Sequence, residues 1–176
     1  MLMQRLASQI IGAKLYTVHT GGKIGEITAI LVRETDLKLE LLIVSSIENN
    51  KKPLYLLSSD IRALDGGKII IDSYDRLSEA EDLLRHQDLI KSGYKLFGTR
   101  VQTQSGKKLG KVKDYSVDIT HFFATKLHIR TSWSQKLFHE TLIIDRSDII
   151  DITKDKIIVR DATIKAKSAA KVLPVQ

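Results

Sequence analysis

The sequence predicts an all-β protein in which two small β-barrels follow one another and are joined by one helix. Three observations predict this fold class. The chain aligns with itself, its apolar segments have the length of strands, and its 176 residues suffice for two modules of about 70 to 80 residues each. Hydrophobic residues make up 43% of the chain and charged residues 28%, a balance typical of globular proteins.

The internal repeat rests on blocks that match without gaps. The pattern Leu-x-x-x-x-Ser-Asp-Ile occurs at residues 54–61 and again at 142–149, and Lys-Ile-Ile follows each block at the same distance. Upstream, the glycine-containing block at 21–27 matches 106–112. The offset grows from about 85 to about 88 residues, which places a short insertion in the second copy at 132–139.

The repeat divides the chain into four parts. A first barrel occupies residues 1–76, a linker helix 77–95, a second barrel 96–162 and a basic tail 163–176. Each copy should form five or six short strands, among them 23–32, 37–44 and 109–119. Tight turns are expected at three sites, which are Asn49-Asn50, Asp65-Gly66-Gly67 and Ser105-Gly106.

The linker carries signals of a single amphipathic helix. Ser78 and Glu81 have the spacing of a capping box, in which each side chain binds a free backbone N–H at the helix start. Apolar residues continue the pattern to Lys91, and Gly93 should end it. The expected helix has three to four turns.

The quoted blocks resemble a known family. In the second copy, residues 97–101, the hairpin 105–118 and the closing element 143–149 are similar to the PRC-barrel domain, the β-barrel of the photosynthetic reaction centre H subunit and of a ribosome maturation factor. The first copy is more divergent but keeps 23–25 and 59–61. The resemblance implies two tandem PRC-type barrels with binding and assembly roles toward protein or ribonucleoprotein partners, and no common catalytic apparatus.

Several classes of function find no support in the sequence. The chain has no cysteine, which excludes disulfides and thiolate chemistry. We read no secretory signal and no apolar run of about 20 residues, so we expect no membrane span and a cytoplasmic location. The five histidines lack metal-ligand spacing, and no nucleotide fingerprint occurs. We therefore expect no metal, no cofactor and no catalytic residues: the protein is not expected to be an enzyme.

Asp114 and Asp118 are the one pair that resembles an acid/base pair. On a strand their spacing places the two carboxylates about 13 Å apart, too far for easy cooperation. The first copy has Ala29 and Arg33 at these places. We expect a structural role at a strand or turn.

Positive charge gathers in the second copy. Residues 96–162 have a net charge of +4 and the tail +3, whereas residues 1–76 have +1. Lys107, Lys108, Lys111 and Lys113 share one predicted hairpin, where they could contact phosphates. The alternative is a merely solvated hairpin, because strand alternation should send part of the set to opposite faces.

Trp133 is the second candidate. It lies in the longer loop of the second copy together with Phe138, near Phe122 and Phe123. Tryptophan is favoured at interface hot spots, and the flanking residues of Trp133 are polar, which is typical of a hairpin tip. The rings could equally cap the barrel or pack on the other copy, as we expect of the phenylalanines.

These observations lead to a function hypothesis with an open alternative. We expect a binding or adaptor module that acts through protein–protein contacts, in a ribonucleoprotein assembly or outside one. The alternative is direct RNA binding by the basic hairpin of the second barrel. A homodimer is also compatible with the sequence.

Overall fold

The computed structural model describes residues 3–48, 52–131 and 141–162. Among these residues strands account for 53% and helices for 18%, which confirms the predicted all-β class. The chain forms two compact units. Unit 1 comprises Met1–Lys95 with Ser116–Ala124, and unit 2 comprises Leu96–Tyr115 with the rest of the chain from Thr125. The expected turn at Asn49-Asn50, the insertion at 132–139 and the tail at 163–176 lie outside the described residues.

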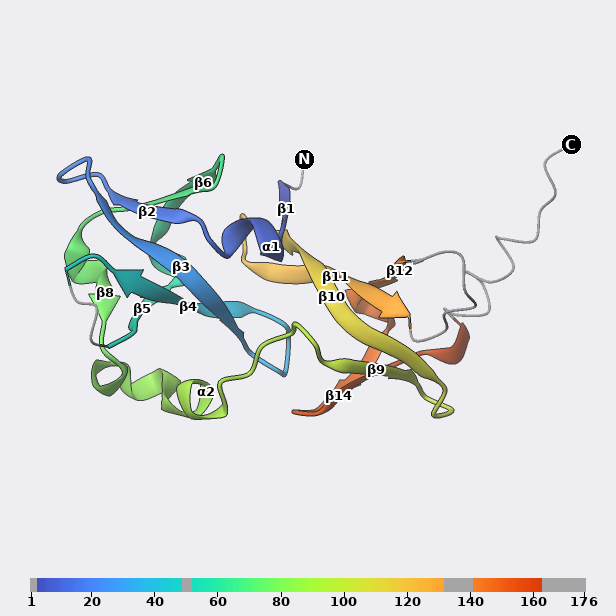
Figure 1. Ribbon diagram of the computed structural model, residues 1–176. Coiled ribbons are helices and arrows are strands. Elements are labelled where there is room, and N and C mark those ends of the chain that lie inside the picture. The colour runs from blue at the N-terminus through green and yellow to red at the C-terminus, as the bar shows by residue number, and fades with distance from the viewer. Residues whose placement is uncertain (1–2, 49–51, 132–140, 163–176) are drawn as a thin grey trace, which may run out of the picture. The chain divides into compact units, whose positions relative to one another are not determined.

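Unit 1 is built on a seven-stranded sheet with the order β6-β7-β2-β3-β4-β5-β8 (Figure 1). The pair β2 and β7 is parallel, and the other pairs are antiparallel. The strands are β2 (Lys14–Thr17), β3 (Lys23–Val32), β4 (Leu39–Ser46), β5 (Leu54–Leu57), β6 (Ile61–Asp65), β7 (Lys68–Ile71) and β8 (Leu77–Ser78). Short helical turns α1 (Ala7–Ile10), η1 (Ser58–Asp60) and η2 (Tyr74–Arg76) complete this part of the chain.

The sheet of unit 2 has the order β12-β11-β10-β9-β14-β13, the strand order of β5-β4-β3-β2-β7-β6 in unit 1. The pair β9 and β14 is parallel, as β2 and β7 are. The helical turn η5 (Arg146–Asp148) stands where η1 stands. The strands are β9 (Arg100–Thr103), β10 (Lys108–Asp118), β11 (Phe123–Thr131), β12 (Thr141–Asp145), β13 (Ile149–Ile152) and β14 (Lys156–Val159).

The core of each unit comes from the alternating apolar positions of its strands. Burying one such side chain contributes about 1.5–3 kcal/mol, so these positions determine which face of each strand turns inward. Equivalent positions of the two sheets are at most 2% exposed: Leu15, Ile27, Leu42, Leu56 and Ile69 in unit 1, and Val101, Val112, Leu127, Ile144 and Ile157 in unit 2.

A glycine at the same place in β3 and β10 allows a close approach of neighbouring backbones. A Cβ atom on Gly110 would lie 2.0 Å from the carbonyl oxygen of Arg130 on β11. A Cβ atom on Gly25 would lie 2.7 Å from the carbonyl oxygen of Ser45 on β4. The repeated glycine of the sequence is thus required by packing of one strand on the next.

The turns after β3 and β10 also match. Leu37 and Phe122 have φ angles of 59° and 58°, which non-glycine residues rarely adopt. The Leu37 N–H donates to the carbonyl of Arg33 (2.9 Å), and the Phe122 N–H to that of Asp118 (2.7 Å). Both side chains are buried, which offsets the cost of the backbone conformation.

Residues 116–124 are part of unit 1 through backbone hydrogen bonds. The strand β1 (Gln4–Leu6) pairs with the end of β10, from Asp118 to Ser116. The Leu39 N–H donates to the carbonyl of Phe122, and the Ala124 N–H to that of Leu37. The two bonds are equivalent. In each, the positive-φ residue of one turn (Leu37 or Phe122) accepts from the N–H of the residue two positions beyond the positive-φ residue of the other turn (Ala124 or Leu39).

The prediction of one linker helix of three to four turns is wrong. The segment instead forms β8, two short 3₁₀ turns and a helix of six residues (Figure 1). These elements are η3 (Ala80–Asp82), η4 (Leu84–His86) and α2 (Gln87–Ser92). Only the end matches the expectation: Gly93 has a φ angle of 58°, and its N–H donates to the carbonyl of Leu89.

Tertiary contacts explain why the longer helix does not form. Ser78, expected as a helix cap, pairs with Tyr55 across the β5–β8 ladder. Leu83 has a non-helical backbone and buries its side chain against Leu31, Leu41 and Tyr55. Burial of one leucine outweighs the small propensity gain of a few helical residues. No helix in the described part of the chain is long and apolar enough to cross a membrane.

Candidate binding face of unit 2

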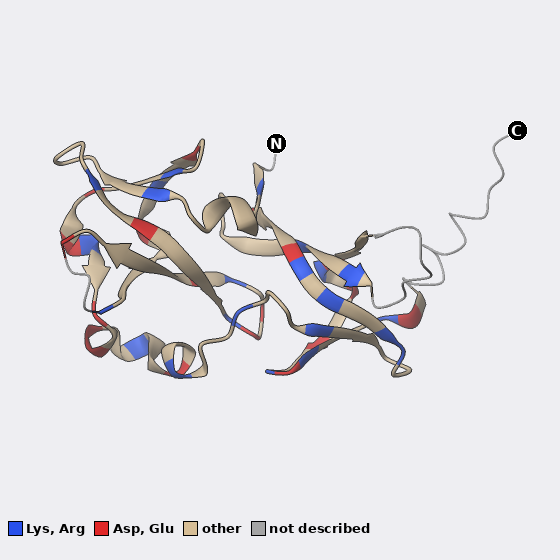
Figure 2. Cartoon of the chain, viewed as in Figure 1, with Lys and Arg blue, Asp and Glu red and all other residues tan. Residues whose placement is uncertain are grey.

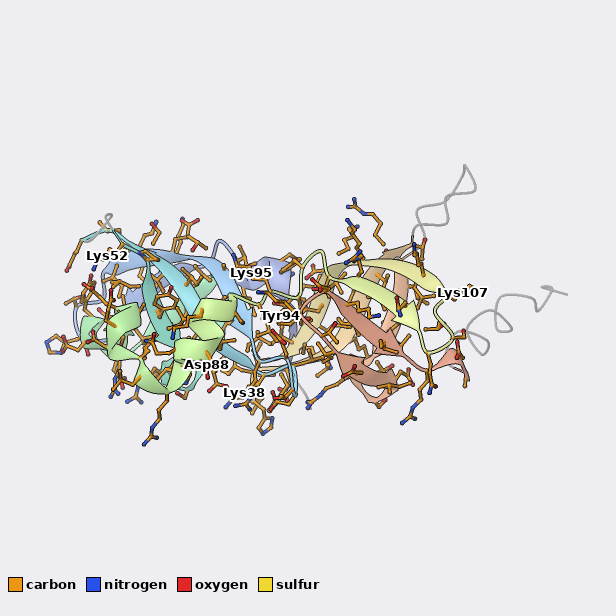
Figure 3. The ribbon with its side chains drawn as sticks, turned by 90° about the horizontal axis from the view of Figure 1, so that it is seen from below. Lys38, Lys52, Asp88, Tyr94, Lys95 and Lys107 are labelled. Carbon is orange, nitrogen blue, oxygen red and sulfur yellow. The ribbon has the colours of Figure 1, made fainter. Side chains whose placement is uncertain are left out.

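The basic hairpin is formed by β9 and β10. Lys107 lies in the turn (Figure 3), and Lys108, Lys111 and Lys113 lie on β10; all four are exposed. The turn is anchored just beyond the end of β14, because the Ser105 hydroxyl donates to Asp161 (2.6 Å) and the Ser105 N–H donates to the same carboxylate (3.1 Å).

A β-bulge brings lysines of β10 to one face. Lys108 lies opposite Gln102 and Lys111 opposite Arg100, while Leu109 and Gly110 together face one residue of β9. The extra residue shifts the alternation by one position, so Lys108 and Lys111, three residues apart, point the same way. Our expectation that alternation separates the lysines is therefore wrong for this pair.

The face extends to strands that the sequence did not indicate. Arg100 on β9 lies opposite Lys111 on one side and Lys156 of β14 on the other. Three cations thus form a row across adjacent strands, which are about 4.8 Å apart. Like charges directly opposite each other destabilise a sheet. We name this row and its exposed cationic neighbours the basic face: Arg100, Lys108, Lys111, Lys113, Arg130 and Lys156.

The basic face differs from its counterpart in unit 1 by its charge balance. Figure 2 shows basic residues as successive bands along β9 and β10. Among the residues that the structure describes, no carboxylate lies within 4.0 Å of these six cations. In unit 1, Glu26 occupies the position of Lys111, lies opposite Lys14 and is 3.8 Å from Lys23. Unit 1 therefore neutralises at this place the charge that unit 2 accumulates.

Two carboxylates border the basic face. Asp151 on β13 lies opposite Ile158 of β14, and Asp145 on β12 lies opposite Lys126 of β11. Both lie on strands at the edges of the sheet. Negative charge thus limits the face at both edge strands, and on β10 Asp114 follows Lys113 and accepts a hydrogen bond from the Tyr115 N–H.

The structure describes only some of the aromatic candidates. Phe122 is 9% exposed in its turn, which confirms packing for this ring. Trp133 and Phe138 lie outside the described residues, so the hypothesis on Trp133 stays a prediction.

Asp118 has the contacts of a turn-stabilising carboxylate. It accepts hydrogen bonds from the Thr120 N–H (2.9 Å) and pairs with the His121 ring at 2.8 Å. Desolvation opposes ionisation of this buried group, but the hydrogen bonds from His121 and Thr120 prevail and lower the pKa of Asp118. Asp114 accepts from the N–H of Tyr115. The structural role expected for these aspartates agrees with these contacts.

Unit 1 contains a cavity of about 400 Å³ that the sequence did not reveal. Arg33, Glu40, His86 and Asp88 are among its lining residues; Asp88 is labelled in Figure 3. Glu40 lies 3.3 Å from Arg33 and 3.5 Å from His86, so three of the lining side chains contact one another. In the described part of the chain, no group of three or more acidic or histidine side chains could hold a metal ion.

Comparison with known proteins agrees with the architecture of unit 2. No curated protein matches the chain. Residues 90–163, which contain every strand from β9 to β14, match the model of the PRC-barrel domain, in agreement with the resemblance of the second copy.

Proposed function

We propose that the protein is a non-catalytic adaptor that binds a protein partner through the basic face of unit 2. The observation that carries the proposal is the row of Lys111, Arg100 and Lys156, where three like charges lie side by side without a carboxylate nearby among the described residues. Such a row lowers the stability of the free sheet and gains energy when an anionic partner covers it.

The shape of the site supports binding rather than catalysis. Charges spread over a sheet face present a broad surface, whereas catalysis requires groups that converge within hydrogen-bond reach of one reacting atom. The matched strand order of the two sheets supports the further proposal that unit 1 is a second, divergent PRC-type barrel, whose Glu26 and ion pairs leave it without this surface. We place the protein in the cytoplasm.

RNA is the second candidate partner, because the six cations of the basic face, five of them exposed, would also suit a phosphate backbone. Single-stranded RNA sites usually add aromatic side chains on which bases stack. The six residues of the basic face are all lysine or arginine, and their neighbours across the strands include Gln102, opposite Lys108, and Thr141, opposite Arg130. This composition favours an acidic protein, within an RNA-containing assembly or outside one.

Affinity capture from the native cell tests the proposal. Wild type is compared with a variant in which Lys108 and Lys111 become Glu, and with the control variant Lys14→Glu/Lys23→Glu, which makes the same charge change at two exposed lysines of unit 1, at the places of Arg100 and Lys108. We expect a protein that is lost only from the first variant and is retained after RNase treatment. Loss on RNase treatment would favour RNA, and identical captures by all three proteins would contradict the basic face as a binding site. Trp133→Ala tests the remaining candidate in the same assay.

A further inference from the structure

The outer edge of β12 differs from its counterpart in unit 1. There, β8 pairs with β5, joining Tyr55 to Ser78 and Leu56 to Leu77. The equivalent positions on β12 are Ile143 and Ile144, and β12 ends the order of its sheet (Figure 1). No described residue pairs with β12 on the side away from β11. An unpaired strand edge offers its backbone N–H and C=O groups to a further strand.

The side chains at these positions also differ in their exposure to solvent. Tyr55 is 9% exposed because Leu83 packs on it, with Leu89 and Ile90 nearby. Ile143 is 42% exposed. Thus unit 1 covers this part of its sheet with its own residues 77–92, and the described residues of unit 2 leave the matching part uncovered.

We infer that the edge of β12 and the exposed side chain of Ile143 bind a segment of a protein partner that takes the place of residues 77–92. The segment adds an extended apolar residue to β12, as Leu77 adds to β5, and then turns so that a second apolar side chain covers Ile143, as Leu83 covers Tyr55. Main-chain hydrogen bonds provide affinity in this mode, and side-chain pockets provide selectivity.

The charge of the surroundings determines the chemistry of this segment. Lys126 of β11 lies opposite Asp145 of β12, which balances its charge, whereas Arg130 of β11 lies opposite the neutral Thr141, and the basic face continues from Arg130 to β10. The segment therefore carries an acidic residue where it passes Arg130, as residues 77–92 carry Glu79, Glu81 and Asp82 between their apolar residues. The chain's own tail, with Lys165, Lys167 and Lys171 and no carboxylate side chain, has the wrong charge for this place.

This inference rests on the proposed binding of a protein and adds the form of its bound segment. A labelled peptide with the sequence of residues 75–92 serves as the probe, because it carries the apolar and acidic residues that cover unit 1. Binding to the full chain is measured by fluorescence anisotropy with wild type, Ile143→Lys and Ile150→Lys. Ile150, 45% exposed on β13 of the same sheet, is the matched control.

We expect the Ile143 variant to bind the peptide about tenfold more weakly, since a buried apolar contact is lost, and the Ile150 variant to bind within about twofold of wild type. Hydrogen exchange should show β12 exchanging faster than β5 in the free chain and slowing when the peptide is added. Equal binding by all three proteins overturns the inference. The inference is also overturned if, without the peptide, the amide hydrogens of β12 are as protected from exchange as those of β5, since another part of the chain would then cover β12.

Failure of this inference and failure of the proposed function give different results. If capture depends on Lys108 and Lys111 while the peptide does not bind, the partner binds the basic face without adding a segment to the edge of β12. If the peptide binds but an RNA oligonucleotide displaces it in the wild type, the site belongs to RNA and both proposals are wrong.

Discussion

Replacing Gly110 by alanine should destabilise unit 2 severely. The added Cβ atom would lie 2.0 Å from the Arg130 carbonyl oxygen, whereas ordinary contacts begin at 3.4 Å, so β10 and β11 would have to separate by the difference, about 1.4 Å. Backbone hydrogen bonds hold neighbouring strands at a fixed spacing and cannot absorb such a shift. The φ angle of 146° at this residue adds strain for any L side chain.

We expect the Gly110→Ala chain to lose about 2–5 kcal/mol of unfolding free energy, the sum of overpacking of about 1–3 kcal/mol and backbone strain of about 1–2 kcal/mol. Gly106→Ala is the control on the same hairpin: its φ angle is 87°, but a Cβ atom there meets nothing within 4 Å. It should cost only the strain.

Urea unfolding followed by far-ultraviolet circular dichroism measures both variants, with the midpoint and slope compared to wild type. If unit 1 and unit 2 unfold in separate steps, only the step of unit 2 should move. The packing argument is refuted if Gly110→Ala is no less stable than Gly106→Ala. A milder result would mean that the bulge of β10 rearranges, and Lys108 should then lose its place beside Lys111.

The remaining predictions concern three residues of unit 1, with one comparison residue in unit 2. Asp118→Asn should cost about 1–2 kcal/mol at neutral pH, because a buried, charge-assisted hydrogen bond to His121 is weakened. The folded-state pKa of Asp118 is lowered, so its contribution to stability is present above the unfolded-state pKa and is lost as pH falls through the folded-state pKa. Thermal unfolding should therefore show a smaller stability difference between variant and wild type at acidic pH than at neutral pH. An equal difference at both pH values would contradict this. Leu83→Ala should cost about 2–4 kcal/mol in urea unfolding, whereas Ile143→Ala in unit 2 should change stability by less than about 0.5 kcal/mol. Gln87→Ala removes hydrogen bonds to two carbonyls of the preceding turns and should cost about 1 kcal/mol, seen as a lower thermal midpoint; an unchanged midpoint would show those bonds to be unimportant.

Part of the candidate site could be predicted from the sequence. Lys107, Lys108, Lys111 and Lys113 stand close together in the chain, so a local pattern suffices to single them out. Arg100 and Lys156 are 56 residues apart, and only the parallel pairing of β9 with β14 brings them together. Sequence periodicity carries no information on which strands become neighbours.

The bulge of β10 is a second reason why the site could not be predicted fully from the sequence. Alternation of side chains predicts that Lys108 and Lys111 face opposite ways, and the extra residue at Gly110 reverses this. The repeated glycine was visible in the sequence. A glycine in a strand can mark either a bulge or a close approach of two backbones, and the sequence does not distinguish these two functions. In the folded chain Gly110 has both functions.

The linker shows how tertiary contacts override local preference. Ser78 and Glu81 have the spacing of a capping box, and helix propensity favours one helix from there to Lys91. The pairing of Ser78 with β5 and the burial of Leu83 require an extended strand and a break at those residues. A few tenths of a kcal/mol per residue in propensity cannot compete with a buried leucine.

The sequence by itself determined the all-β class, the matching blocks of the two copies, the turn glycines and the gathering of positive charge in the second half. These properties arise from local periodicity, backbone conformational limits and composition, which a linear chain displays directly. Only the tertiary structure decided which cations share a face, how the linker folds and which strand edge is left uncovered. Each depends on pairing between residues distant in the chain, where burial and register outweigh any local preference.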